Sequence, residues 1–321
     1  MSDLKNIRGK SIQSLPSDPA NIPLGEIWYN SEEYSFKRKF VQNTYQIVSC
    51  SQAYNGTSWT TGGALATGRH SLAGAGTNTA ALAFGGNGPS SCTESYNGTS
   101  WTAGGSMATA RYGLAGAGAS NTAALAFGGN VTVDAVTCTE SYNGSTWTAG
   151  GSMATARFNL AGAGTNTAAL AFGGCTSYPF NTVTCTESYN GTSWTAGGAL
   201  GTARYSLAGA GTNTSALGFG GYDADYLTCT ESYNGTSWTA GGALGTAGYS
   251  LAGAGASNTA ALAFGGFNRG SVTESYNGST WSAGGNMIGN ITAKHAGAGT
   301  NTAALAFGGC GYIGTTVICT L

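Results

Sequence analysis

Arginine and glutamate recur at regular intervals along this chain, and these are its residues most suited to chemistry. The arginines are Arg69, Arg111, Arg157 and Arg204, and the glutamates are Glu94, Glu140, Glu187, Glu231 and Glu274. A ring of guanidinium groups could bind an anion, or each arginine could be held by a glutamate and by backbone carbonyl groups. Their near-equal numbers favour the structural role, because buried arginine is usually paired.

Catalytic and metal-binding groups are sparse. The chain has only two histidines, His70 and His295, which is thin for a metal site or for a nucleophile and base. Asp223 and Asp225 are too few for calcium, which needs about six oxygen ligands. No carboxylate pair stands out for glycoside hydrolysis. We therefore predict a protein without enzymatic activity, cofactor or metal.

Six near-copies of one unit fill residues 45–321. Their period is marked by Trp59, Trp101, Trp147, Trp194, Trp238 and Trp281, which lie 42 to 47 residues apart. A period of this size built from strand-like pieces is typical of a β-propeller with one four-stranded blade per repeat. The fold class is therefore all-β, with six antiparallel blades.

Each repeat contains four strand candidates, which are 71–77, 79–86 and 91–97 in the first copy, followed by a Ser-Trp-Thr segment. An Asn-Gly pair between the third and fourth is a strong hairpin signal. The repeats are offset from the chain ends: 47–65 supplies a third and fourth strand, and 296–309 a first and second. We expect both ends to complete one blade, and Thr316–Leu321 resembles a further third strand.

The copies differ mainly in the connection between the second and third strands. In an antiparallel blade this connection emerges on the same face as the link from the fourth strand to the next blade. Loops carry function on a rigid scaffold, so this face is the predicted binding surface, although drift in unconstrained loops would look the same. The candidate ligand-binding residues are Tyr178, Phe180, Tyr222, Asp223, Asp225, Tyr226, Phe267, Arg269 and Tyr312.

Five cysteines share one repeat position, before the third strand: Cys50, Cys92, Cys138, Cys185 and Cys229. Val272 takes this position in another copy, which predicts a small apolar core site. Cys175 and Cys310 could form cross-strand disulfides with Cys185 and Cys319. Reduced, buried thiols are the favoured alternative, because other copies keep the shared cysteine without a partner.

Residues 1–44 form a separate segment that carries much of the charge. Gly25–Asn30, which includes Trp28 and Tyr29, and the following Ser35–Lys37 predict a small β-hairpin. The segment is too short for its own core, so it needs packing on the propeller, trimerisation or docking to a larger assembly. It has no apolar core of a secretory signal, and no run in the chain reaches the length of a membrane span.

Electrostatics exclude some partners of the propeller. Charged residues make up 8% of the chain and the net charge is −1. Such a surface lacks the excess of positive charge that binds nucleic acid or an anionic membrane.

The repeat resembles the Kelch family in four markers, which are Arg111, Gly128-Gly129, Glu140-x-Tyr142 and Trp147. Most of this set recurs in four further copies. The resemblance covers residues 45–321 and implies a Kelch-like propeller. Three departures are Gly248 in place of the arginine, Lys294-His295 in its place in the last copy, and Gln52 in place of the glutamate.

The N-terminal stretch 15–31 resembles the leader of tail-fibre and other virion proteins of marine bacteriophages. This resemblance implies a virion structural protein, made in the host cytoplasm, whose residues 1–44 bind other virion proteins. We expect a fibre or appendage that binds a host-surface glycan without cleaving it. The alternatives are a decoration protein with a purely structural propeller, and a glycan-cleaving enzyme.

Overall fold

The computed structural model describes residues 13–15, 27–32, 35–289 and 291–320, and within these the regular elements are all β-strands. The chain divides into two compact units, one made of residues 1–46 with 312–321 and the other of residues 47–311. The described part of the chain contains no helix long and apolar enough to cross a bilayer.

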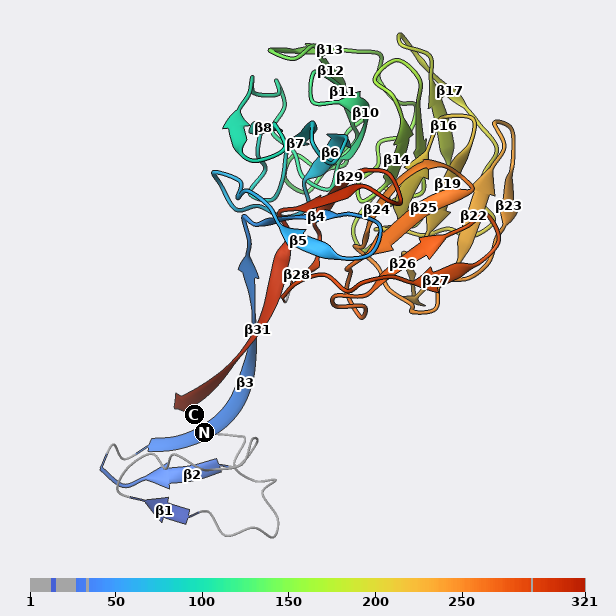
Figure 1. The fold of residues 1–321 in the computed structure, drawn as a ribbon. Coiled ribbons are helices and arrows are strands. Elements are labelled where there is room, and N and C mark those ends of the chain that lie inside the picture. Colours follow the sequence, from blue (N-terminus) through green and yellow to red (C-terminus); the bar gives the residue numbers. More distant parts are fainter. Residues whose placement is uncertain (1–12, 16–26, 33–34, 290, 321) are drawn as a thin grey trace. The chain divides into compact units, whose positions relative to one another are not determined.

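The larger unit is a six-bladed β-propeller in its described residues, as the sequence predicts (Figure 1). Three blades are β6 (Ala73–Gly76), β7 (Ala81–Phe84), β8 (Thr93–Tyr96) and β9 (Trp101–Ala103); β10 (Ala115–Ser120), β11 (Ala123–Phe127), β12 (Thr139–Tyr142) and β13 (Trp147–Ala149); and β14 (Ala161–Gly164), β15 (Ala169–Phe172), β16 (Thr186–Tyr189) and β17 (Trp194–Ala196). The next two are β18 (Ala208–Gly211), β19 (Ala216–Phe219), β22 (Thr230–Tyr233) and β23 (Trp238–Ala240); and β24 (Ala252–Ser257), β25 (Ala260–Phe264), β26 (Thr273–Tyr276) and β27 (Trp281–Ala283).

The sixth blade joins the two ends of the repeat region. It is ordered β29 (Ala296–Gly299), β30 (Ala304–Phe307), β4 (Ser51–Tyr54) and β5 (Trp59–Thr61), and Figure 1 shows red β29 together with blue β4 and β5. Tyr54 pairs with Ala304 and Ser51 with Phe307. The predicted extra third strand at Thr316–Leu321 does not enter this blade, because β4 already occupies that place and β31 (Cys310–Thr320) lies next to β3 (Ser35–Ile47) and β28 (Ile291–Ala293) instead.

The innermost strands of neighbouring blades contact one another around the whole ring, and their small residues make this possible. A Cβ atom on Gly116 would lie 2.6 Å from the carbonyl oxygen of Gly74, and one on Gly162 would lie 2.6 Å from that of Gly116. Real Cβ atoms do not approach so closely, so the alternating Ala-Gly sequence is required where the blades converge. The strands leave an axial cavity of about 90 Å³ lined by glycine and alanine.

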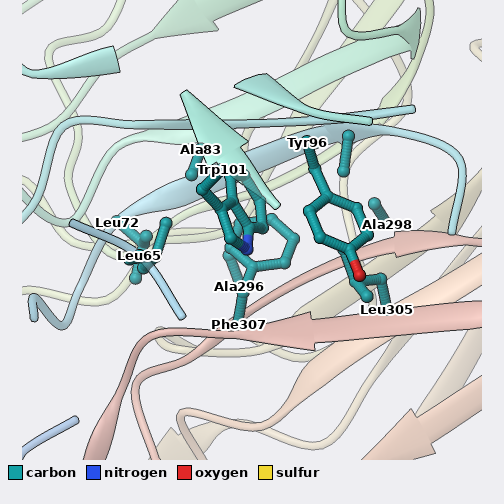
Figure 2. Close-up of a cluster of buried hydrophobic side chains, with 10 residues drawn as sticks. Leu65, Leu72, Ala83, Tyr96, Trp101, Ala296, Ala298, Leu305 and Phe307 are labelled. Carbon is teal, nitrogen blue, oxygen red and sulfur yellow. The ribbon is translucent and has the colours of Figure 1, made fainter. Parts of the chain in front are cut away.

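Large side chains fill the space between blades farther from the axis. Each blade's tryptophan packs on a phenylalanine of the preceding blade, with ring centroids 4.8–5.0 Å apart: Trp59–Phe264, Trp101–Phe307, Trp147–Phe84, Trp194–Phe127, Trp238–Phe172 and Trp281–Phe219. Figure 2 shows the closing seam, where Trp101 and Phe307 meet among Leu65, Leu72 and Leu305. This seam joins the two ends of the repeat region by the same contact that joins every other pair of blades.

A closed circle of backbone hydrogen bonds surrounds the axis on the side of the Arg-bearing connections. The amide of each member donates to the carbonyl of the next over 2.7–3.0 Å, in the order Ser71, Lys294, Ser250, Ser206, Asn159, Gly113 and back to Ser71. All six residues have φ between 51° and 61°. The left-handed conformation is costly for residues other than glycine, so the ring holds five such residues in a strained backbone state.

The smaller unit contains the predicted N-terminal hairpin. Strand β2 (Ile27–Asn30) pairs antiparallel with β3, and Trp28 lies opposite Lys37. Strand β1 (Gln13–Leu15) adds a parallel partner to β2. The side chains of Trp28 and Tyr29, predicted to serve attachment, lie outside the described residues.

We predict that Ser51→Thr stabilises the propeller. In five seams the tryptophan Nε1–H donates to a threonine Oγ1 of the preceding blade over 2.9 Å, as Trp147 does to Thr93. In the closing seam Ser51 takes the threonine's place, its hydroxyl donates to the Gly63 carbonyl, and Trp101 Nε1 is left buried without a partner. A threonine can place its methyl group there and turn its hydroxyl to Trp101, so the free energy of unfolding should rise by about 1 kcal/mol.

The control is Thr139→Val, which removes the acceptor of Trp194. Chemical denaturation should show a loss of about 1–3 kcal/mol for this variant, the cost of an unmet buried donor. A Ser51→Thr protein no more stable than the parent would contradict this account of the closing seam.

Candidate functional site

The recurring arginines and glutamates form buried ion pairs. Arg69–Glu94, Arg111–Glu140, Arg157–Glu187 and Arg204–Glu231 have N–O distances of 2.8–3.1 Å. Arg111 also donates to the Gly128 carbonyl at 2.9 Å and to the Cys138 carbonyl at 2.8 Å. Burial lowers the pKa of each guanidinium group, and the paired glutamate opposes that shift. These arginines are occupied inside their blades and do not face a ligand.

Each glutamate also fixes the connection that enters its blade. A carboxylate oxygen accepts the backbone amide of Ala66, Ala108, Ala154, Gly201 or Gly245 over 2.6–2.7 Å. The arginine and glutamate together hold the incoming connection against the end of the second strand. The pair is therefore the device that places the loops of this face.

Arg269 belongs to this set of pairs and not to the ligand surface on which it was predicted. It comes from the variable loop of the blade that has Gly248 in place of the arginine, and its Nη1 lies 2.8 Å from Glu274 Oε1. Its side chain is buried, its Nε donates to the Gly265 carbonyl at 3.1 Å, and Nη1 donates to the Thr246 carbonyl. A Cβ on Gly248 would lie 2.6 Å from Cγ and Cδ of Arg269, so the glycine makes room for this replacement.

In the closing blade the incoming connection is held without an ion pair. Gln52 replaces the glutamate, donates from Nε2 to the Ile288 carbonyl at 2.7 Å, and accepts the Ile288 amide at 2.8 Å. The sequence predicted that Lys294-His295 takes the place of the arginine in this blade, and this prediction is wrong. Lys294 is equivalent to Ser206, because both are members of the axial ring with positive φ. His295 is equivalent to Leu207, because both side chains pack over the first glycine of the preceding blade's Gly-Gly pair.

Five of the predicted binding residues, Tyr178, Phe180, Tyr222, Tyr226 and Phe267, lie in one continuous group of rings, here called the aromatic arc. Its members are Phe158, Tyr178, Phe180, Tyr205, Tyr222, Tyr226, Tyr249 and Phe267, from three consecutive blades. Phe180 stacks on Tyr205 at 4.4 Å, Tyr226 stacks on Tyr249 at 5.7 Å, and Tyr249 stacks on Phe267 at 4.9 Å. Tyr222 contacts both Tyr205 and Tyr249 at 5.7 and 5.4 Å, which links the stacks.

Backbone pairing positions the arc. The residue after each arginine position forms a β-bridge to the residue after the Gly-Gly pair of the same blade: Phe158 to Cys175, Tyr205 to Tyr222 and Tyr249 to Phe267. Sequence reasoning missed Phe158, Tyr205 and Tyr249, because they lie in the repeated segment and not in the variable loops. These residues could have been found because one repeat position, directly after the arginine position, is aromatic in consecutive copies. The first copy has His70 at this position.

Three rings of the arc are exposed, three more (Tyr222, Tyr249 and Phe267) are partly exposed, and Phe158 and Tyr205 are buried beneath them. Tyr178, Phe180 and Tyr226 are 46%, 45% and 42% exposed, whereas Phe158 is fully buried. The loops that carry them are joined, because the Thr182 hydroxyl donates to Asp223 Oδ1 at 3.1 Å. Burial raises the pKa of Tyr178 and Tyr205 to about 12, so these rings stay uncharged near neutral pH.

A buried polar group lies at one end of the arc. Asn130 Nδ2 donates to the hydroxyl groups of Tyr112 and Tyr178, both at 3.5 Å. The Asn130 side chain is fully buried, and its Oδ1 has no hydrogen-bond partner. The arc therefore ends beside an acceptor that is not satisfied by the protein.

The other predicted site residues are Tyr312, Asp223 and Asp225. The side chain of Tyr312 lies outside the described residues. Within the described residues, no three His, Cys, Asp or Glu side chains lie close enough together to hold a metal ion. Asp223 and Asp225 face each other across the hairpin β20 (Tyr222–Asp223) and β21 (Asp225–Tyr226), and both are exposed.

The prediction for the cysteine position shared by five copies is wrong, whereas the favoured prediction of a reduced, buried thiol is confirmed for Cys175. The position shared by five copies is not a core site: Cys92 is exposed, and Cys50, Cys138, Cys185 and Cys229 are partly exposed. Their carbonyl groups rather than their thiols are used in four copies, because an arginine binds there. Cys175 is buried and donates to the Phe158 carbonyl, and neither it nor Cys185 forms a disulfide. Cys319 lies outside the described side chains.

No protein-family model matches this chain, and no curated protein matches its sequence. The propeller fold rests on the blade contacts described above.

We predict that Arg269→Ala costs about 3 kcal/mol of unfolding free energy, because it leaves the buried Glu274 carboxylate without its partner. Gly248→Arg alone should also destabilise, since the new side chain meets Arg269. The double variant Gly248→Arg/Arg269→Ala restores the arrangement of the other blades and should recover most of the loss. Urea unfolding of all four proteins checks this, and additive losses in the double variant would contradict the replacement.

We predict that His295→Leu reduces acid sensitivity. Burial lowers the pKa of His295 to about 4, whereas in the unfolded chain it should be near the ordinary value of about 6.5. The unfolded state therefore takes up the proton first, and stability falls by up to about 3 kcal/mol as the pH drops from about 6.5 to 4.

Leucine is the residue at this position in the five other blades, so the variant should fold. His70 has a pKa lowered to about 4 as well, and it contributes equally to both proteins. The difference in unfolding free energy between parent and variant should grow in the variant's favour on acidification. A pH-independent difference would contradict the assignment.

Proposed function

We propose that this protein is a non-catalytic binding protein that holds a glycan on the aromatic arc. The observation that carries the proposal is the continuous contact of eight rings from three consecutive blades on the variable face. Rigid aromatic rings with a polar edge suit contact with the apolar faces of sugar rings at low entropic cost. A supported, half-exposed ring such as Phe180 or Tyr226 loses little freedom on binding.

The scaffold supports the same proposal. The ion pairs of the three blades that carry the arc, together with the axial ring, hold the connections at the base of its loops, so the exposed rings stand on a rigid base. Binding residues are often found on loops of this kind. The remaining setting follows from the N-terminal resemblance alone: a phage fibre or appendage in the virion, with residues 1–44 binding other virion proteins and the propeller binding the host surface.

Binding of the full-length chain to an array of bacterial surface glycans tests the proposal. Phe180→Ala and Tyr226→Ala should each weaken binding to the glycan that the parent recognises by about tenfold, because truncating a central aromatic contact costs more than about 1 kcal/mol. Thr239→Ala, an exposed change on outer strand β23, is the matched control and should leave binding unchanged.

The outcomes separate the alternatives. A parent protein that binds no glycan would contradict the proposal and favour a decoration protein. Glycan binding that survives both ring truncations would move the site away from the arc. Release of reducing sugar by the parent, lost in Asp223→Asn or Asp225→Asn, would favour a glycan-cleaving enzyme.

A further inference from the structure

The charges on the variable face are distributed unevenly around the arc. Five guanidinium groups on this side of the ring are buried and paired with glutamates, so they offer no positive charge to a ligand. Asp223 and Asp225 instead lie exposed on the hairpin that carries Tyr226, and no described salt bridge neutralises them. The arc therefore meets solvent with a local excess of negative charge.

These carboxylates are held beside the rings. Asp225 Oδ1 accepts the backbone amide of Tyr226 at 2.7 Å, and Asp223 Oδ1 accepts the Thr182 hydroxyl from the loop of Phe180. One oxygen of each carboxylate is thus used in positioning, and both residues remain exposed. Both carboxylates lie on the hairpin that carries Tyr226, and Asp223 also contacts the loop of Phe180.

The other unmet group of the arc is also an acceptor. Asn130 Oδ1 lies buried without a partner, on the side chain whose Nδ2 donates to the Tyr178 hydroxyl. The Asn130 oxygen is shielded from solvent, so the exposed carboxylates are the groups that favour a ligand rich in hydrogen-bond donors. The exposed ring of Tyr226 adds to this preference, because the face of an aromatic ring attracts cations.

Building on the proposed function, we infer that the glycan bound by the aromatic arc carries free amino groups, so that protonated amino sugars lie against Asp223, Asp225 and Tyr226. Acidic polysaccharides are repelled by the same carboxylates. Neutral sugars stack on the rings but lack the charge contribution.

Chitosan and chitin oligosaccharides of equal length test this inference, because they share a backbone and differ in whether the amines are free or acetylated. The full-length chain should bind the free-amine form about tenfold more tightly at low salt and slightly acid pH. This preference should shrink as salt rises, since exposed charges are screened. Polygalacturonate, an acidic polymer, should not compete.

The variants isolate the charge. Asp225→Asn and Asp223→Asn keep the hydrogen bonds to Tyr226 and Thr182, because an amide oxygen still accepts, and each should weaken chitosan binding about threefold, in line with single exposed charge pairs. The double variant should bind chitosan and chitin alike. Asp134→Asn removes one charge from a loop outside the hairpin and should have a smaller effect.

Equal affinity for the two oligosaccharides in the parent would overturn the inference. If both then lose affinity in Phe180→Ala, the proposed glycan site remains and only the charge preference is wrong. If the parent binds neither oligosaccharide, the inference is also overturned, and the glycan array decides whether the proposed function survives. Tight binding of polygalacturonate would also overturn the inference, because the carboxylates should repel an acidic polymer.

Discussion

Each blade of this propeller is locked to the one before it by a tryptophan, which packs on a phenylalanine and in five seams donates a hydrogen bond to a threonine. A single four-stranded blade cannot bury its two apolar faces, so its stability depends on both neighbours. The contact between Trp101 and Phe307 closes the circle with the same pair of rings that joins the other blades. The rest of the structure depends on this repeated seam.

A ring built this way separates structure from recognition. The Ala-Gly strands, the seams and the Arg–Glu pairs use residues that hardly vary between copies, and they fix the positions at which the variable loops begin and end. The blade with Gly248 shows how strict this requirement is, because a guanidinium group from another position still reaches Glu274. Variation is then free to accumulate in side chains above the fixed base, which is where the aromatic arc lies.

Much of the fold could be predicted from the repeats, because the tryptophan period, the Asn-Gly turns and the Ala-Gly strands each depend on local chemistry. The arc could be predicted only in part. Tyr178, Phe180 and Tyr226 lie in loops that differ between copies. Tyr205 and Tyr249 lie in the repeated segment and join the arc through β-bridges to Tyr222 and Phe267, which follow the Gly-Gly pairs. The role of Arg269 could be found only from the structure. Nothing in the sequence indicates that a loop residue replaces the arginine missing at Gly248, 21 positions earlier.

Hydrogen–deuterium exchange of the full-length chain tests the closed ring most directly. The account predicts that the closing blade, β29, β30, β4 and β5, is protected as strongly as the five blades formed from continuous sequence, and that the loops of the variable face exchange first. Amides of Ser51–Tyr54 and Ala304–Phe307 that exchange orders of magnitude faster than those of Ala169–Phe172 would show an open ring and contradict the account.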